Sequence, residues 1–327
     1  MSRIPRILVF LAAALLAAAV HADEKQLVKA SFIPQWIPQA QFAGYYTAYE
    51  KGFYAKRGID LTILPGGPEC PPDRLLLSGE ADFCTLWLSR AVQLRAQGRK
   101  IVNIAQMLQR SALMLVAKKS SGIETPHDMN GKKVGLWGPI FQIQARAFFE
   151  QYGVTVQVIP QSFSVNLFLR GGVDLASAMW YNEYHTILNS GINPEELSTF
   201  FFQDYGLNFP EDGIYALEET YNQHPEFSCA FVEASIEGWR YAFAHPEETL
   251  DMVIRNLKQA HFPASRVHQR WMLSRMKELI LWNESSNAVG ALARKDFDRV
   301  ASTMKDEGMI DQIPEFQDFY RKCHADR

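Results

Sequence analysis

GIDLTIL, at residues 58–64, is followed by GEADF at 79–83, and the chain repeats this pair as GVTVQVI at 153–159 and GVDLA at 172–176. In each pair a turn glycine precedes an apolar segment of strand type, and a second glycine precedes a short strand that contains an aspartate. A glycine before a strand is common, so one match alone indicates little. Two matches in the same order and at similar spacing predict two related α/β lobes.

Strand and helix patterns alternate around both units. Strands are expected at 28–33, 58–64, 101–107 and 132–137, and helices at 39–51, 89–97 and 142–152. The first of these helices carries Phe42, Tyr45, Tyr46 and Tyr49 on one face and ends at Gly52. Strands separated by helices are typical of a parallel, doubly wound sheet. We therefore expect an α/β fold with one such sheet in each lobe.

The last third of the chain has a helical character. A returning strand is expected near 213–216, and candidate helices begin at Pro225, Pro246 and Ser265. An apolar face between Phe231 and Phe243 predicts that these helices pack on the first lobe. With hinge crossings near 116–119 and 212–216, the first lobe takes residues 23–116 and the second takes 117–213. Residues 214–327 then return to the first lobe and form the C-terminal helices.

The first 22 residues have the pattern of a secretory signal peptide. Arg3 and Arg6 form a positive region, an unbroken apolar run follows from Ile7 to Val20, and the segment up to Ala22 matches a small-x-small cleavage site. A membrane-spanning helix needs about 20 apolar residues, so this run is too short to span. We expect cleavage after Ala22 and a periplasmic location; an uncleaved anchor is the alternative.

Composition excludes several classes of protein. The 327 residues are 47% hydrophobic and 21% charged, which is typical of a globular chain and not of disorder or repeats. Lys and Arg number 33 against 36 Asp and Glu, so no basic excess exists to neutralise a phosphate backbone, and no nucleic-acid partner is expected. A chain of this length exceeds what one hydrophobic core organises, which again favours two lobes.

Signatures of catalysis are missing from the sequence. No GxSxG elbow, GxGxxG loop or phosphate-binding loop occurs, and no His or Cys pair has metal-ligand spacing, so we expect no catalytic residue, no metal and no cofactor. The cysteines, Cys70, Cys84, Cys229 and Cys323, are too few to scaffold the fold. Either Cys70 pairs with Cys84, or all four are small buried hydrophobes.

Aromatic and acidic side chains gather at the expected carboxyl ends of the strands, where open α/β sheets bind ligands. Trp36, Trp87 and Trp137 lie at such ends, and so do Asn182, Glu183 and Asp204; these six come from both lobes. The rings could enclose a flat heterocycle while the acids accept its N–H groups. Each tryptophan alone is more often a core residue, and Glu183 alone could cap a helix. The clustering favours a binding site.

The motifs at these positions resemble a known family. WIPQAQFAGYY (36–46), EKGFY (50–54), PGG (65–67), WYNE (180–183) and GWRYAFAHPEE (238–248) occur in the order found in the thiamine-pyrimidine-precursor-binding family of ABC-transporter solute-binding proteins. The resemblance runs from about Ser31 to about Val253. Pyrimidine synthases and binding proteins for flavin precursors, sulfonates and nitrate share this scaffold.

The resemblance implies a two-lobed periplasmic binding protein of type II-like fold that closes on a small molecule and delivers it to ABC permease subunits at the inner membrane. The implied ligand is an aminopyrimidine, hydroxymethylpyrimidine or formylaminopyrimidine. Rings would stack on it and Glu183 would accept its amine, helped by Asn182 and Asp204. The candidate ligand-binding residues are Trp36, Gln41, Tyr45, Gly66, Gly67, Trp87, Trp137, Asn182, Glu183 and Asp204.

Three alternatives stand beside this interpretation. The synthases carry a lysine and a histidine where this chain has Leu86 and Arg90, and a cysteine-rich stretch where it has LNFPEDG at 207–213, so an enzyme is not expected. An alkyl sulfonate, nitrate or flavin ligand is the second alternative; for an anion the one nearby cation is Arg90, expected on a helix face in a solvated or paired state. A secreted sensor component is the third.

Overall fold

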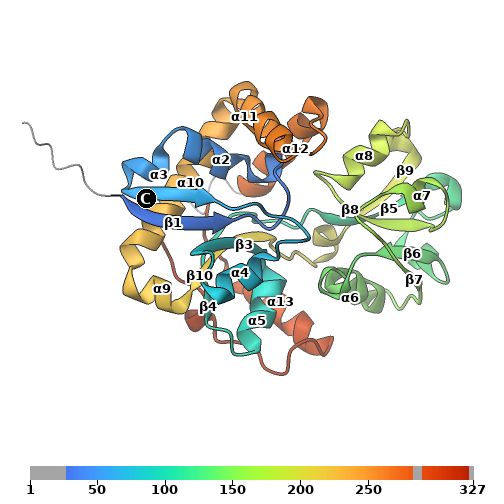
Figure 1. Ribbon diagram of the computed structural model, residues 1–327. Coiled ribbons are helices and arrows are strands. Elements are labelled where there is room, and N and C mark those ends of the chain that lie inside the picture. Colours follow the sequence, from blue (N-terminus) through green and yellow to red (C-terminus); the bar gives the residue numbers. More distant parts are fainter. Residues whose placement is uncertain (1–26, 283–288, 324–327) are drawn as a thin grey trace, which may run out of the picture.

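Two sheets, one in each lobe, organise the chain. The computed structural model describes residues 27–282 and 289–323, and within these ranges the strands form two five-stranded sheets (Figure 1). The first sheet has the order β2 (Ile59–Ile63), β1 (Val28–Ile33), β3 (Phe83–Trp87), β10 (Asp212–Leu217), β4 (Ile101–Gln106). The second has the order β7 (Gln157–Pro160), β6 (Lys133–Leu136), β8 (Leu175–Met179), β5 (Leu113–Lys118), β9 (Leu197–Phe201). The expected two-lobed α/β fold is confirmed.

The sheets are mixed, which corrects the expectation of purely parallel strands. β1 pairs in parallel with β2 and β3, as β6 does with β7 and β8. β10 runs antiparallel to β3 and β4, and β5 runs antiparallel to β8 and β9. Both reversed strands come directly from the other lobe. Because a strand that arrives from the opposite lobe enters the sheet at its ligand-side edge, it runs against the strands already there.

The positions of β5 and β10 also move the expected lobe boundaries. The chain leaves the first sheet after Gln106 and enters the second at Leu113, so residues 113–116 lie in the second lobe and not in the first. It leaves the second sheet after Phe201 and re-enters the first at Asp212, two residues before the expected return at 214.

Helices cover both sheets. In the first lobe they are α2 (Ala43–Glu50), α3 (Phe53–Lys56), α4 (Pro72–Ser78), α5 (Leu88–Ala96) and the short η1 (Ala40–Phe42). The second lobe has α6 (Ile143–Gln151), α7 (Asn166–Leu169), α8 (Glu183–Asn189), and the 3-10 turns η2 (Lys119–Ser121), η3 (Pro126–Met129), η4 (Pro139–Phe141), η5 (Pro194–Glu196) and η6 (Phe202–Tyr205). The last third supplies α9 (Glu218–Gln223), α10 (Pro225–Ala244), α11 (Pro246–Gln259), α12 (Arg266–Ile280), α13 (Arg294–Asp306) and α14 (Phe316–Phe319).

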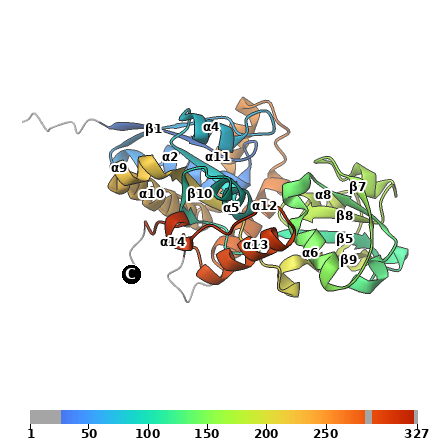
Figure 2. The same ribbon diagram turned by 90° about the horizontal axis from the view of Figure 1, so that it is seen from below.

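The C-terminal helices pack on the first lobe, as the apolar face of residues 231–243 predicts. α10 and α11 contact α2, and α13 contacts α5 (Figure 2). In addition, α12 reaches α8 and α13 reaches α6, so both helices also touch the second lobe. The sequence pattern does not indicate these two contacts across the lobes.

The contact between α2 and α10 is very close. A Cβ atom on Gly238 would lie 2.1 Å from the backbone oxygen of Gly44 and 2.6 Å from the Cβ of Ala48. Trp239, next in α10, is 1% exposed and packs edge-on against Tyr45 with ring centroids 5.8 Å apart. The helices therefore approach at a point where neither can carry a larger residue.

We expect Gly238→Ala to destabilise the protein by about 1–3 kcal/mol, because the added methyl overpacks a rigid helix crossing. In a chain of this size that lowers the thermal midpoint by roughly 3–10 °C, measurable by calorimetry. Gly138→Ala is the matched control, since a Cβ there meets no atom within 4 Å. Equal midpoints for the two variants would contradict the close crossing.

The cysteines do not follow either expectation. Cys229 in α10 forms a disulfide with Cys323, and both Cys70 and Cys84 are free thiols. The expected pairing of Cys70 with Cys84 is therefore wrong: Cys84 is fully buried inside β3, while Cys70 lies in the loop that follows β2.

The expected signal peptide at 1–22 lies outside the described residues. Among the residues that are described, no helix is long and apolar enough to cross a membrane.

Candidate ligand-binding site

A cavity of about 530 Å³ lies between the lobes, within the usual range for small-molecule sites. Side chains from the carboxyl ends of β1, β3, β6 and β8 line it, together with residues of α11, α12 and the loop between them. The strand ends meet here because parallel strands in each sheet point their carboxyl ends at the same edge. The cavity thus lies at the strand ends where the sequence predicts a binding site.

Aromatic rings from both lobes form part of its walls. Trp36 and Trp87 come from the first lobe and Trp137 from the second, as the sequence predicts. Trp36 meets Phe163 edge-on with centroids 4.5 Å apart, and Trp87 meets Phe141 in the same way at 4.7 Å. Phe141 and Phe163 belong to the second lobe and carry no signal in the sequence. Each aromatic pair therefore joins one lobe to the other across the cavity.

Glu183 supplies the acid of the second lobe. It is the first residue of α8, lines the cavity and is 7% exposed. Its Oε2 accepts a hydrogen bond of 3.0 Å from the Met179 backbone N–H, and its Oε1 accepts one of 2.8 Å from the Asn182 amide. Burial raises the pKa of Glu183 to about 7, partly offset by these donors. A buried carboxylate that is costly to ionise is a strong acceptor for a ligand N–H.

Asn182 connects Glu183 to the first lobe. Its Oδ1 lies 2.9 Å from Nε2 of His268, a residue of α12 that also lines the cavity. Nδ1 of His268 lies 2.9 Å from Nδ1 of His185 in α8, and burial lowers the pKa of His268 to about 4. Trp271, one turn further along α12, stacks on His185 and donates its indole N–H to the Trp180 carbonyl at 2.9 Å.

A second polar group lies on the floor of the first lobe. Asp212, the first residue of β10, accepts hydrogen bonds from the side-chain amides of Gln35 and Gln41, the latter at 2.7 Å. Gln39 in turn donates to Gln41 at 2.6 Å. Burial raises the pKa of Asp212 to about 7, with the Gln41 bond acting against it. Gln41 thus lies on the cavity as predicted, held by an aspartate that the sequence does not single out.

Glu211 precedes Asp212 and holds the hinge. Its Oε1 accepts hydrogen bonds from the backbone N–H groups of Ala112 and Leu113, at 2.5 and 3.2 Å, and from the Ser111 hydroxyl at 3.1 Å. Burial raises the pKa of Glu211 well above its usual range, with a further rise from Asp212. The two crossings between the lobes are therefore joined by one carboxyl group.

Gly66 and Gly67 support the site without lining it. A Cβ on Gly66 would lie 2.1 Å from the Pro34 oxygen and 2.4 Å from the Trp36 oxygen, and Gly67 has φ +139°, which favours glycine. Their loop therefore packs directly on the backbone that carries Trp36. The sequence predicts that these glycines contact the ligand. In the structure they instead support the backbone that carries Trp36.

Tyr45 and Asp204 lie away from the cavity, against expectation. Tyr45 is 1% exposed in the first-lobe core, 4.7 Å from the Phe32 ring. Asp204 lies in η6 with a largely exposed side chain, 3.9 Å from Arg110. β5 separates β9 from β8, so the residues after β9 sit two strand spacings, about 10 Å, from those after β8.

Arg90 lines the cavity but is committed to other side chains. Its Nε donates to Asp73 at 3.0 Å and its Nη1 to Gln93 at 2.6 Å. Of the two states expected for Arg90 on its helix face, solvated or paired, the structure shows the paired one. Among the described residues, no group of three or more His, Cys, Asp and Glu side chains is placed to hold a metal ion.

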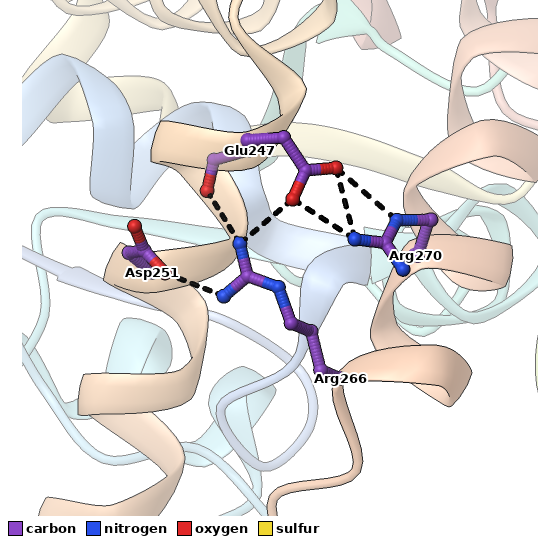
Figure 3. Close-up of polar contacts among 4 residues, drawn as sticks. All are labelled: Glu247, Asp251, Arg266 and Arg270. Carbon is purple, nitrogen blue, oxygen red and sulfur yellow. Dashed lines mark hydrogen bonds and ion pairs between the residues drawn. The ribbon is translucent and has the colours of Figure 1, made fainter.

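An ion cluster joins the start of α12 to α11. Glu247 of α11 accepts from Arg266 at 2.9 Å and, through both carboxylate oxygens, from Arg270 at 2.9 and 3.0 Å; Arg266 also pairs with Asp251 (Figure 3). His268 and Gln269 lie between the two arginines and both face the cavity. Sequence patterns give no sign that this helix reaches the strand ends, because the contact depends on tertiary packing.

Comparison with known proteins agrees with this architecture. Residues 39–249 match the model of the family described as NMT1/THI5 like. The formylaminopyrimidine-binding protein of Halalkalibacterium halodurans is 23% identical over 282 residues, 84% of this chain and 83% of the relative. The riboflavin-binding protein RibY of Chloroflexus aurantiacus is 26% identical over 264 residues, 76% and 72% of the two chains. The 4-amino-5-hydroxymethyl-2-methylpyrimidine phosphate synthase of Legionella pneumophila is 22% identical over 250 residues, 72% and 76%.

Solved structures share the arrangement of lobes. The periplasmic aliphatic sulphonate binding protein SsuA from Escherichia coli superposes with a TM-score of 0.67 at 15% identity, covering 89% of this chain and 91% of that one. At this identity the likeness shows the fold, which is that of the periplasmic binding proteins. The family match covers most of both lobes, and the chain belongs to the NMT1/THI5-like family.

Proposed function

We propose that this protein is an exported solute-binding protein of an ABC importer that captures a thiamine pyrimidine precursor, hydroxymethylpyrimidine or formylaminopyrimidine, and delivers it to the permease. One observation carries the proposal: a buried carboxylate, Glu183, lies among aromatic walls in a cavity that both lobes close. A two-lobed protein that encloses its ligand gains binding energy from both lobes and couples capture to closure.

The chemistry of the cavity favours a flat ring with N–H donors. Glu183 offers carboxylate oxygens to an exocyclic amine, and Trp36, Trp87 and Trp137 offer faces or edges to a ring. Arg90 is already bound by Asp73, so an anionic ligand finds no unengaged cation among the described lining residues. These features favour a pyrimidine over a sulfonate or nitrate.

A flavin is the second candidate. The cavity is lined by more aromatic side chains than one pyrimidine ring can contact. Two of them, Phe163 and Phe262, lie at the rim of the cavity and are 56% and 38% exposed. A larger tricyclic ring would cover these exposed faces. The riboflavin-binding relative supports keeping this ligand in the test.

A synthase role is not proposed. Leu86, at the position that corresponds to the synthase lysine, is 3% exposed on the cavity wall, and Arg90 replaces the histidine. The segment 207–213 contains no cysteine. With neither a cofactor lysine nor these reactive groups, the residues support binding and not catalysis.

Export is supported from two sides. The signal-peptide pattern at 1–22 predicts it, and the Cys229–Cys323 disulfide suits an oxidising compartment such as the periplasm.

A ligand panel tests the proposal on the mature protein. We expect hydroxymethylpyrimidine or formylaminopyrimidine at about 100 times its Kd to add about 2.7 kcal/mol to stability, and so to raise the thermal midpoint by roughly 5–10 °C. Riboflavin, taurine and nitrate are measured beside them, and calorimetry then gives the Kd. A shift with riboflavin alone would replace the pyrimidine by the flavin. A shift with an anion alone would contradict the proposed chemistry of the cavity.

A further inference from the structure

The acid that is proposed to meet the ligand is connected to the opposite lobe through its neighbour Asn182. Glu183 and Asn182 belong to the second lobe, whereas His268 is carried by α12, which packs on the first. The 2.9 Å contact between His268 and Asn182 and the 2.8 Å bond from Asn182 to Glu183 form one continuous chain. This chain crosses the cavity boundary between the lobes.

The direction of each hydrogen bond follows from the acceptor at its end. The Glu183 carboxylate accepts, so the Asn182 amide presents N–H to it and turns its Oδ1 the other way. Oδ1 can only accept, so Nε2 of His268 must carry a proton. In a neutral ring Nδ1 is then bare and accepts from Nδ1–H of His185, 2.9 Å away. The Asn189 side-chain amide lies 3.1 Å from the same His185 nitrogen, so in this arrangement it turns its oxygen toward that N–H.

The surroundings of His268 keep this arrangement in place. Gln269 accepts from the Ala40 backbone N–H at 2.7 Å, which docks the first turns of α12 on η1. α11 turns two carboxylates toward this end of α12. Glu247 forms ion pairs with Arg266 and Arg270, and Asp251 forms one with Arg266 (Figure 3). From α8, the titratable groups on this chain are His185 and Glu183.

We propose that His268 is a positioning residue for the ligand, which through Asn182 holds the Glu183 carboxylate in its binding orientation only while the two lobes are closed. This inference deepens the proposed function and rests on it. Opening the lobes withdraws His268 and frees the Asn182 amide, which leaves the Met179 N–H as the one fixed donor to Glu183. Ligand affinity and closure thereby strengthen each other through a residue that need not touch the ligand.

Three substitutions test the chain, with formylaminopyrimidine and hydroxymethylpyrimidine as probes and calorimetry as readout. His268→Leu, which lacks a donor, should weaken binding about tenfold. His268→Gln keeps an N–H near Nε2 and should restore affinity to within about threefold. In an Asn182→Ala background, His268→Leu should cost less than about twofold, because the link it removes is already broken.

Val267→Ala is the control on the same helix, since Val267 is 63% exposed; its affinity should equal that of the wild type. A purely structural role for His268 predicts equal losses for the leucine and glutamine variants, and additive losses with Asn182→Ala. Either result would overturn the inference.

A ligand-free measurement separates this inference from the proposed function. Nitrogen chemical shifts of the imidazole rings should show His268 neutral, with its proton on Nε2, at pH 7 and down to about pH 4, as its lowered pKa requires. Asn182→Ala should shift this proton toward Nδ1. If the wild type binds neither pyrimidine but these shifts hold, the proposed ligand is wrong and the contact between the lobes stands. A His268 ring that titrates near its ordinary pKa with mixed tautomers overturns the contact itself.

Discussion

Replacing Glu183 by glutamine is expected to weaken binding of the pyrimidine ligand by at least roughly 30-fold. Removing one partner of a buried, charge-assisted contact costs about 2–5 kcal/mol, because the remaining group is left without its full acceptor at a buried position. Glutamine keeps the size of the side chain but offers one oxygen where the carboxylate offers two. One of the two donors that now hold Glu183, Met179 N–H or the Asn182 amide, then faces an N–H group. Titration calorimetry at pH 8 measures the loss.

Asp204→Asn is the matched control. It removes a carboxylate that the sequence places at an equivalent strand end but that the structure places outside the cavity. The affinity of this variant should equal that of the wild type. A loss for Asp204→Asn equal to that for Glu183→Gln would indicate a general effect of charge and would contradict the assigned role of Glu183.

The same carboxylate makes binding depend on pH. Burial raises the pKa of Glu183 in the free protein to about 7, above its ordinary value near 4.5. A ligand N–H favours the ionised form, so ligand binding lowers this pKa and releases a proton where the group was protonated. Affinity is therefore greatest above pH 7 and falls by up to about tenfold per pH unit below it. In the Glu183→Gln variant, this contribution to the pH dependence of ligand affinity should disappear. An affinity that rises as the pH falls through 7 would reverse the expected sign.

Burial of the same acid lowers the stability of the unliganded protein. A carboxyl whose folded pKa lies above its unfolded pKa destabilises the ionised folded state. Its effect on the free energy of unfolding is absent below about pH 4.5 and complete above about pH 7. Asp212, with a folded pKa of about 7 against 3.8, acts in the same direction over a wider range. Both acids therefore cost stability when ionised, and of the two only Glu183 lines the cavity, where a bound donor can offset that cost.

How far the sequence predicts the site depends on where each residue stands relative to a strand. Four lining residues lie at the end of a strand that runs toward the cavity or shortly after it, so strand patterns alone place them: Trp36, Trp87, Trp137 and Glu183. Asp204 also follows a strand, yet its strand is at the sheet edge. Strand order is a tertiary property, which no local pattern contains.

Residues outside the strand ends escape prediction for a related reason. Tyr45 shares a helix face with other aromatic rings, and that face packs into the core, as an apolar helix face usually does. His268 and Gln269 reach the cavity from α12 because the bond from Gln269 to Ala40 and the buried side chains Met272 and Met276 hold that helix on the first lobe. Asp212 lies behind the cavity wall and accepts hydrogen bonds from the side-chain amides of Gln35 and Gln41. Each depends on partners distant in sequence.

Loss of the Cys229–Cys323 disulfide is expected to have the largest effect on stability. The bond links α10 to the C-terminal segment, which is also joined to β4 by a bridge between Tyr320 and Asn103. The linked residues are 94 apart in sequence, so the bond restricts a long loop of the unfolded chain, and removing such a bond costs about 2–5 kcal/mol. In a protein of this size the thermal midpoint should fall by roughly 5–15 °C in the double variant Cys229→Ala, Cys323→Ala.

Two further measurements make this result specific to the bond. Cys70→Ala removes a free, partly exposed thiol and should change stability by no more than about 0.5 kcal/mol. Reduction of the wild type should lower its midpoint to that of the double variant, and the double variant itself should not respond to reductant. Neither Cys229 nor Cys323 lines the cavity, so the ligand affinity of the double variant at 25 °C should equal that of the wild type. Because the variant unfolds at a lower temperature, it should lose binding at a lower temperature than the wild type does. Four titratable thiols in unreduced, exported protein would contradict the bond, and with it the use of this disulfide as support for an oxidising compartment.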